Sequence, residues 1–153
     1  MHSEITTDLS IVHENLSKRK ANKENVVLIK TGALNPIHRS HIANMIKVKQ
    51  YLEEVYDLNV VAGYISPTHD QYVQGKLGKH LIPSQHRIQM CQRAIQEENQ
   101  QHWLAVDQAE ALGRTLHSHI SSFLCFVFSS FVYFSKKCDI QSSTVSQREN
   151  SIG

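Results

Sequence analysis

The sequence has 153 residues, enough for one domain of ordinary size, and its 16 Lys and Arg residues nearly balance its 14 Asp and Glu residues. A formal net charge of +2 excludes a strongly basic nucleic-acid-binding protein and a highly charged disordered chain. All five phenylalanines lie between Phe123 and Phe134, which separates an ordinary globular segment from a tail of different composition.

We therefore expect three parts: a leader over residues 1–24, a domain over residues 25–117 and an atypical tail over residues 118–153. The leader has no apolar run of signal-peptide length, and its acidic residues Glu4, Asp8 and Glu14 argue against a mitochondrial presequence. We expect it to be a short helix or flexible, and we expect a cytoplasmic or nuclear location.

The three cysteines are scattered and form no C-x-x-C pair. They are Cys91, Cys125 and Cys138. Too few cysteines are present for a disulfide framework, and their spacing does not suggest a zinc or redox site. A reducing compartment and no metal site of this kind are therefore expected.

The secondary-structure pattern becomes regular at Val26, where a short β-branched and aliphatic run predicts a strand that is buried on both faces. An amphipathic helix over 40–56 follows, then a second strand over 59–65, a polar loop with two glycines, and a second helix opened by Pro83 with Ser84 as its N-cap. Residues 103–107 predict a third strand. The order β-α-β-α-β is half of a Rossmann-like α/β fold with a parallel sheet.

In such sheets ligands bind at the carboxyl ends of the strands, and polar residues gather there in this sequence. After the first strand, Gly32 would let a ligand approach the backbone, and His38 and His41 would share one face of the first helical turn and grip one phosphate. His38 could instead cap the helix. Because cations in a first helical turn oppose the helix dipole, at a cost of ~0.3–1 kcal/mol, His86 and Arg87 are expected to face an anion.

The segment Gly32-x-x-Asn35-Pro36-x-His38-x-x-His41 resembles the (H/T)-x-G-H signature of the nucleotidyltransferase superfamily, in the form found in eukaryotic nicotinamide/nicotinate mononucleotide adenylyltransferases. The resemblance continues in order through four further segments and covers roughly residues 25–112. These are Gly63–Pro67, Asp70-x-Tyr72, Leu81-Ile82-Pro83-Ser84-x-His86-Arg87 and Trp103-x-x-Val106-Asp107.

The resemblance implies transfer of an adenylyl group from ATP to a mononucleotide, with release of pyrophosphate and with Mg²⁺ helping to neutralise charge. Catalysis of that kind is positioning plus electrostatic stabilisation. By resemblance, His41 and His38 would be catalytic, and the ATP phosphates would contact Gly32, Ala33, Asn35, His38 and His41. Ser66, His86, Arg87 and Trp103 are candidates for the second substrate, although His86 and Arg87 equally fit helix-start structure and Trp103 a core position.

Two departures from the family bear on the substrate. Ser40 stands where the wider superfamily has the glycine of its signature, and Ala109 stands where the pyridine-nucleotide enzymes carry a tryptophan that stacks on the nicotinamide ring. Since stacking on one aromatic contributes about 1–3 kcal/mol, its loss weakens the preference for a pyridine mononucleotide. A cytidylyltransferase-like enzyme with another acceptor therefore remains an alternative.

The tail departs further, because family members continue with more strands and helices and a Ser/Thr-rich signature that ends in arginine. Here Ser142-Ser143-Thr144 and Arg148 are a near miss that we attribute to chance. The apolar stretch from Ile120 to Phe134 is short of the ~20 residues that span a bilayer, and its pattern shows neither the alternation nor the turn of a strand pair. We interpret the tail as lying outside the ancestral domain.

Two classes of function follow. The chain is either a nucleotidyltransferase or an inactive, truncated form of one, because three strands alone would leave an exposed sheet edge and an incomplete core. The expected partners are small-molecule nucleotides and another copy of the chain, with no nucleic acid and no membrane.

Overall fold

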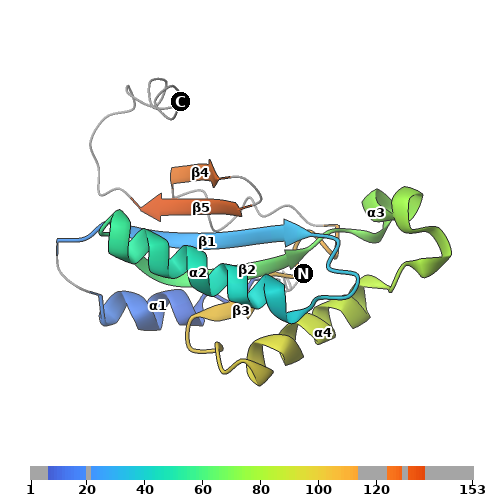
Figure 1. Ribbon diagram of the computed structural model, residues 1–153, viewed down its shortest axis with the longest axis horizontal. Coiled ribbons are helices and arrows are strands. Elements are labelled where there is room, and N and C mark those ends of the chain that lie inside the picture. Colours follow the sequence, from blue (N-terminus) through green and yellow to red (C-terminus); the bar gives the residue numbers. More distant parts are fainter. Residues whose placement is uncertain (1–6, 20–21, 114–123, 129–130, 137–153) are drawn as a thin grey trace, which may run out of the picture.

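The computed structural model describes residues 7–19, 22–113, 124–128 and 131–136, and it contains one five-stranded sheet with the strand order β3-β2-β1-β5-β4 (Figure 1). Three strands are parallel to one another: β1 (Asn25–Gly32), β2 (Asn59–Pro67) and β3 (Leu104–Val106). Strand β5 (Phe131–Lys136) is antiparallel to β1, and β4 (Leu124–Phe128) is antiparallel to β5. The expected parallel β-α-β-α-β unit is confirmed over β1, β2 and β3.

The helices lie on both faces of the sheet. They are α1 (Ser10–Ser17), α2 (Arg39–Val55), α3 (Asp70–Leu77), the 3₁₀ helix η1 (Gly78–His80) and α4 (Ser84–Glu97). Helices α2 and α4 cover one face and α1 covers the other (Figure 1). Among the described residues, none of these helices is both long and apolar enough to cross a bilayer.

Strand β1 shows why both faces are covered. Val26 and Leu28 belong to the apolar cluster beneath α2 and α4, whereas Val27 and Ile29 belong to the cluster beneath α1. Successive side chains of a strand point to opposite faces, so a run with no polar residue has to be covered twice. The unbroken apolar sequence from Val26 to Ile29 therefore accounts for the layered arrangement.

The segment before β1 is a helix, which was one of the two alternatives for the leader. Val12 of α1 is buried against the sheet, and the Asn15 side chain donates to the Val61 carbonyl at 2.9 Å and to the His102 carbonyl at 3.0 Å. The Tyr64 hydroxyl donates to the Asp8 carbonyl at 2.7 Å. These contacts attach α1 to the outer face of β2 and β3.

Two local predictions were wrong. The polar loop after β2 contains helix α3, which has no buried residue and so gave no apolar periodicity to detect. The N-cap of α4 is Pro83 rather than Ser84, which is the first residue of the helix. Proline suits a helix start because the missing N–H would have had no partner there.

The three-strand unit was expected to leave an exposed sheet edge, and on its β1 side that edge is paired. Strand β5 pairs with β1 from Asn25 opposite Lys136 to Lys30 opposite Phe131, and β4 continues the sheet beyond it. The strand pair that the tail pattern failed to indicate is therefore present, and it occupies one edge of the parallel unit. The near-miss segment Ser142–Arg148 lies outside the described residues.

Candidate functional site at the carboxyl ends of β1 and β2

The loop after β1 is connected to the loops that follow β2 and precede α4. The Thr68 N–H donates to the Gly32 carbonyl at 2.9 Å. The Asn35 amide donates to the His80 carbonyl at 2.9 Å, and its oxygen accepts from the Ile82 N–H at 2.7 Å. Asn35 therefore holds the loop by two backbone contacts, and the role of its carboxamide here is structural.

Arg87 ties all three loops together. Its guanidinium is completely buried and donates to the carbonyls of Ala33 at 2.6 Å, Thr68 at 2.7 Å and Ile82 at 2.8 Å. It also donates to Asp70 Oδ1 at 2.5 Å. Of the two roles that the sequence left open, contact with the second substrate or helix-start structure, the geometry is that of the second.

The Asp70 carboxylate completes this arrangement. Partial burial alone would raise its pKa, but the hydrogen bonds from Arg87 and from the Ser84 N–H outweigh that effect and lower the pKa of Asp70 below its usual 3.8. Asp70 is therefore ionised at neutral pH and balances the buried guanidinium. Its two oxygens are both engaged, so it acts as a partner of Arg87.

The loop after β1 has one unusual backbone position. Leu34 has φ +47°, in the left-handed region that non-glycine residues avoid at a cost of order 1–3 kcal/mol. Its side chain is buried in the cluster beneath α2 and α4, which offsets that cost. Beside it, a Cβ added to Gly32 would meet only Leu34 Cγ, at 4.0 Å, so the backbone of Gly32 is open to a ligand.

The structure brings the two predicted histidines together. His38 is the N-cap of α2 and His41 is its third residue, and their ring centroids lie 3.9 Å apart. His41 Nδ1 accepts from the His38 backbone N–H at 3.1 Å, so the proton of a neutral His41 ring is on Nε2. His38 Nδ1 lies 2.5 Å from Ser40 Oγ. His41 is thus oriented as a donor through Nε2 at the start of α2.

The local electrostatics keep His41 neutral in the free protein. Its half-burial lowers the pKa below 6.5, and the positive charges of His38 and Lys30 lower it further. Lys30 is itself buried near the carboxyl end of β1, and burial lowers the pKa of its ammonium group. Two histidines and a lysine close together favour an anion, because each group is stabilised in its charged form by a negative neighbour.

Ser66 and Asp107 form a separate buried cluster. Ser66 Oγ donates to Asp107 Oδ2 at 2.8 Å, and Asp107 Oδ1 also accepts from the Thr7 hydroxyl. Both Ser66 and Asp107 are completely buried. The Ser66 hydroxyl, a candidate for substrate contact, is therefore used to join the carboxyl ends of β2 and β3.

The remaining candidates are dispersed. His86 is exposed in the first turn of α4. Trp103 is 3% exposed at the amino end of β3, where its indole N–H donates to Gln100 Oε1 at 2.7 Å. Trp103 is thus a core residue at the end of β3 opposite Asp107. Ala109, in place of an aromatic, is buried and has no ring to stack on a base.

Within the described part of the chain, no three His, Cys, Asp or Glu side chains are arranged to hold a metal ion. The nearest carboxylate to the loops, that of Asp70, is committed to Arg87 and the Ser84 N–H. Mg²⁺ often enters a site bound to substrate phosphates with few protein ligands.

The sequence model of one family, described as cytidylyltransferase-like, matches residues 29–146. The chain belongs to the cytidylyltransferase-like family. It is a nucleotidyltransferase by family, and the match extends through β4 and β5. This family assignment accounts for the order of the sequence motifs along the chain.

Individual relatives of this chain also carry nucleotidyltransferase names. The chain is 41% identical over 88 residues to nicotinamide/nicotinic acid mononucleotide adenylyltransferase 2 of Danio rerio, covering 58% of this chain and 27% of that protein. It is 32% identical over 107 residues to nicotinamide/nicotinic acid mononucleotide adenylyltransferase 1 of Saccharomyces cerevisiae, covering 69% of this chain and 25% of that protein. The chain thus spans about a quarter of the length of these relatives.

Sequence reasoning missed two residues: Lys30, beside the histidine pair, and Asp107, in the buried cluster with Ser66. Lys30 could have been noticed as a lone charge inside a buried strand, next to the loop that carries the histidines. Asp107 was quoted only as part of a motif, although an acidic residue directly after a buried strand is a usual place for a structural or binding carboxylate. The roles of both depend on neighbours distant in sequence.

Proposed function

We propose that this chain binds ATP at the loop between β1 and α2 and transfers its adenylyl group to nicotinamide or nicotinate mononucleotide, releasing pyrophosphate. The observation that carries the proposal is the orientation of His41: its Nδ1 is held by the His38 N–H, so Nε2 carries a proton for donation. The printed names of the relatives support the choice of reaction.

The chemistry needs positioning and charge stabilisation, with no covalent intermediate. A phosphate oxygen of the mononucleotide attacks the α-phosphorus of ATP, the bond from that phosphorus to the bridging oxygen breaks, and pyrophosphate leaves with the electron pair. His41 and His38 would donate hydrogen bonds to the phosphate oxygens on which negative charge increases. Gly32 and Ala33 would let the nucleotide lie against the backbone, and Arg87 and Asn35 would keep the loop in place.

Mg²⁺ would arrive as the ATP complex and neutralise phosphate charge. Lys30, which is buried close enough to His41 to affect its pKa, would add a second positive charge on the protein side. ATP binding would raise the pKa of His41 towards its ordinary value, because a phosphate stabilises the imidazolium. The bound phosphate would thereby offset the positive neighbours that keep His41 neutral in the free protein.

The second candidate is transfer to a different acceptor, and it rests on Ala109. This residue is buried and cannot stack on a nicotinamide ring. An acceptor recognised by hydrogen bonds alone, or CTP in place of ATP, is compatible with the same histidine pair.

The test is pyrophosphate release by the purified chain with ATP or CTP, combined with nicotinamide mononucleotide, nicotinate mononucleotide and other phosphorylated acceptors. We expect turnover with ATP and a pyridine mononucleotide, and a loss of about 10²–10³ in kcat for His41→Ala, since one hydrogen-bond donor to the developing charge is removed. His13→Ala, an exposed histidine on α1, is the matched control and should keep full activity.

Turnover only with CTP or with another acceptor would favour the second candidate. No turnover with any pair of substrates, from a protein that is folded by circular dichroism, would contradict both candidate reactions. The chain would then be an inactive, truncated form of such an enzyme. Activity that survives His41→Ala would contradict the assigned site.

A further inference from the structure

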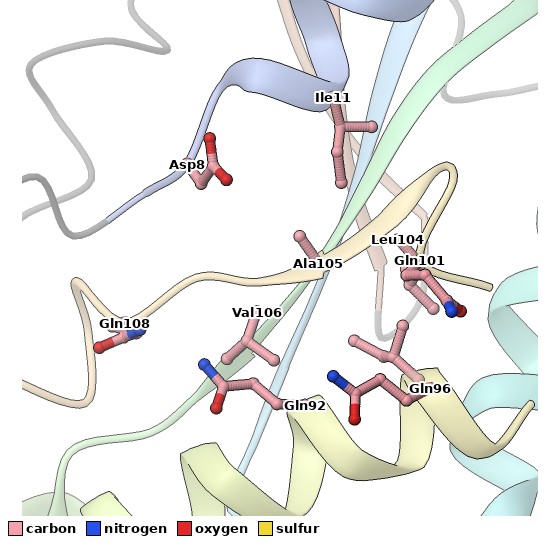
Figure 2. Close-up of a pocket in the computed structure, with 10 residues that line it drawn as sticks. Asp8, Ile11, Gln92, Gln96, Gln101, Leu104, Ala105, Val106 and Gln108 are labelled. Atoms are coloured by element: carbon pink, nitrogen blue, oxygen red, sulfur yellow. The ribbon is translucent and has the colours of Figure 1, made fainter. Parts of the chain in front are cut away.

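A cavity of about 340 Å³ lies beside β3 (Figure 2), and neither His38 nor His41 lines it. Its walls come from three elements: Asp8 and Ile11 at the start of α1, Gln92, Ile95 and Gln96 on α4, and Leu104–Val106 of β3 itself. Gln101 and Gln108 complete the lining. Because α1 and α4 cover opposite faces of the sheet, a cavity that touches both has to open at the sheet edge.

The backbone of β3 presents a hydrogen-bonding pair to this cavity. In the pairing with β2, the Trp103 carbonyl accepts from the Gly63 N–H at 2.7 Å and the Asp107 N–H donates to the Ile65 carbonyl at 2.9 Å. Backbone groups alternate along a strand, so those of Leu104 and Val106 point away from β2. Within the described residues, the Leu104 carbonyl and the Val106 N–H have no hydrogen-bond partner.

At this edge, β3 offers the cavity one hydrogen-bond acceptor, the Leu104 carbonyl, and one donor, the Val106 N–H. The Leu104 N–H is already used, since it donates to the Gln100 carbonyl at 2.9 Å, and after Val106 the chain returns to β2 through Asp107. An added peptide strand derives its affinity from several ladder hydrogen bonds, and β3 offers too few of them. A single planar group that carries one donor beside one acceptor matches the edge better.

The shape of the cavity agrees with a planar ring. A ring aligned with the β3 edge would lie between Ile11 on the α1 side and Ile95 on the α4 side, with Ala105 of β3 behind it. Apolar side chains make up half of the lining and sit beside the fixed backbone groups of β3, and the volume falls within the usual range of small-molecule sites. An exocyclic amino group next to a ring nitrogen, as in adenine, supplies the required donor and acceptor.

The charge of the cavity indicates a ligand without phosphate. Its lining contains four glutamines and the Asp8 carboxylate, but no Lys, Arg or His. Hydrogen bonds from Ser10 lower the pKa of Asp8, so this group is negatively charged at neutral pH. A phosphate would be repelled, whereas ribose hydroxyls could donate to the glutamine oxygens or to the carboxylate.

We propose that the edge of β3 between α1 and α4 is a second binding site, which takes an uncharged nucleoside or base of the adenine type. The amino group donates to the Leu104 carbonyl and the adjacent ring nitrogen accepts from the Val106 N–H. The site shares no residue with the proposed nucleotidyl-transfer site and does not depend on that proposal.

The test uses adenosine as the probe, with equilibrium dialysis for affinity and the backbone amide resonance of Val106 for location. We expect saturable binding with a shift of the Val106 N–H. Purine riboside, which lacks only the amino group, should bind about tenfold more weakly, as expected for the loss of one hydrogen bond in a desolvated site. Gln92→Trp, an exposed substitution that fills the cavity, should weaken adenosine binding by about tenfold or more.

Two matched variants separate this site from the nucleotidyl-transfer site. Gln50→Trp makes the same change on the exposed side of α2, and His41→Ala alters the phosphate-binding histidine, and both should leave adenosine affinity unchanged. The absence of saturable binding, equal binding of purine riboside, or loss of binding in His41→Ala with retention in Gln92→Trp would each overturn the proposal. The Val106 shift is measured on the unaltered chain, so it remains decisive if Gln92→Trp folds poorly.

Discussion

Arg87 shows how the same residue can fit a binding motif and yet serve the fold. A cation in the first turn of a helix suggests an anion nearby, and the anion here is Asp70 of the same chain together with three backbone carbonyls. The guanidinium offers five N–H groups in a fixed plane, so it can satisfy acceptors from several loops at once. Arg87 thereby sets the position of the loop that carries the histidine pair.

Replacing Arg87 with alanine should be strongly destabilising. The change leaves three carbonyls and the Asp70 carboxylate without their shared donor, and we expect the free energy of unfolding to fall by about 3–5 kcal/mol. Urea denaturation measures this. Arg93→Ala, which removes an exposed arginine paired with Glu97 on the same helix, should cost about 0.5 kcal/mol or less. Similar losses for the two variants would contradict the role given to Arg87.

The lowered pKa of His41 makes stability depend on pH. Because the folded value lies below the unfolded value of 6.5, the unfolded chain binds the proton more readily, and stability decreases as the pH falls below 6.5. We expect the drop in melting temperature between about pH 7.5 and about pH 5.5 to be smaller in His41→Gln than in the unaltered chain. Nuclear magnetic resonance titration of the His41 ring checks the pKa directly; a midpoint above 6.5 in the free protein would contradict the assignment.

At the scale of the elements, the contact between β2, β3 and α2 depends on Gly63. A Cβ added there would lie 2.7 Å from Trp103 Cζ3, 2.8 Å from Leu104 Cδ1 and 3.0 Å from Met45 Cε. These side chains are buried and cannot move without disturbing the core. Gly75 in α3 differs, because nothing lies within 4 Å of the position of its Cβ.

Alanine at these two positions should therefore have opposite effects. We expect Gly63→Ala to reduce the free energy of unfolding by about 1–3 kcal/mol through overpacking. Gly75→Ala should increase it by about 0.5–1 kcal/mol, since alanine restricts the unfolded chain and favours a helix. Denaturant unfolding of both variants under one condition provides the comparison, and a stabilised Gly63→Ala variant would show that β3 packs differently.

Elements with a strong apolar period could be predicted from the sequence, and those without one could not. Strands β1 and β2 and helices α2 and α4 each bury a regular apolar set, and all were expected. Helix α3 has no buried residue, so its polar sequence predicted a loop. Of the site, the proximity of His38 and His41 followed from their spacing, whereas the bonds of Arg87 and Ser66 depend on loops distant in sequence.

At the scale of the whole molecule, the parallel unit is extended by a hairpin from the far end of the chain. Strand β5 lies along β1, where the parallel unit would otherwise present unpaired backbone groups. The edge strands of the sheet are β3 and β4, and β3 is only three residues long. Short edge strands offer little to an incoming strand, which reduces unwanted pairing between molecules.

Removal of residues 118–153 should convert a monodisperse protein into an aggregating one. Without β5, the edge of β1 is unpaired from Asn25 to Lys30, a stretch that contains the apolar run from Val26 to Ile29. Size-exclusion chromatography with light scattering of the full and shortened chains would show this. An equally monodisperse shortened chain would mean that β5 contributes little to covering β1.

The Thr7 hydroxyl bonded to Asp107 links two residues that are 100 positions apart in the chain. Thr7 therefore lies beside the carboxyl end of β3. A fluorescent label introduced at Thr7 would therefore lie near Asp107 and Ser66. Such a label can report on changes at that end of the sheet, and a protease site engineered immediately before Thr7 would test whether the junction stays accessible.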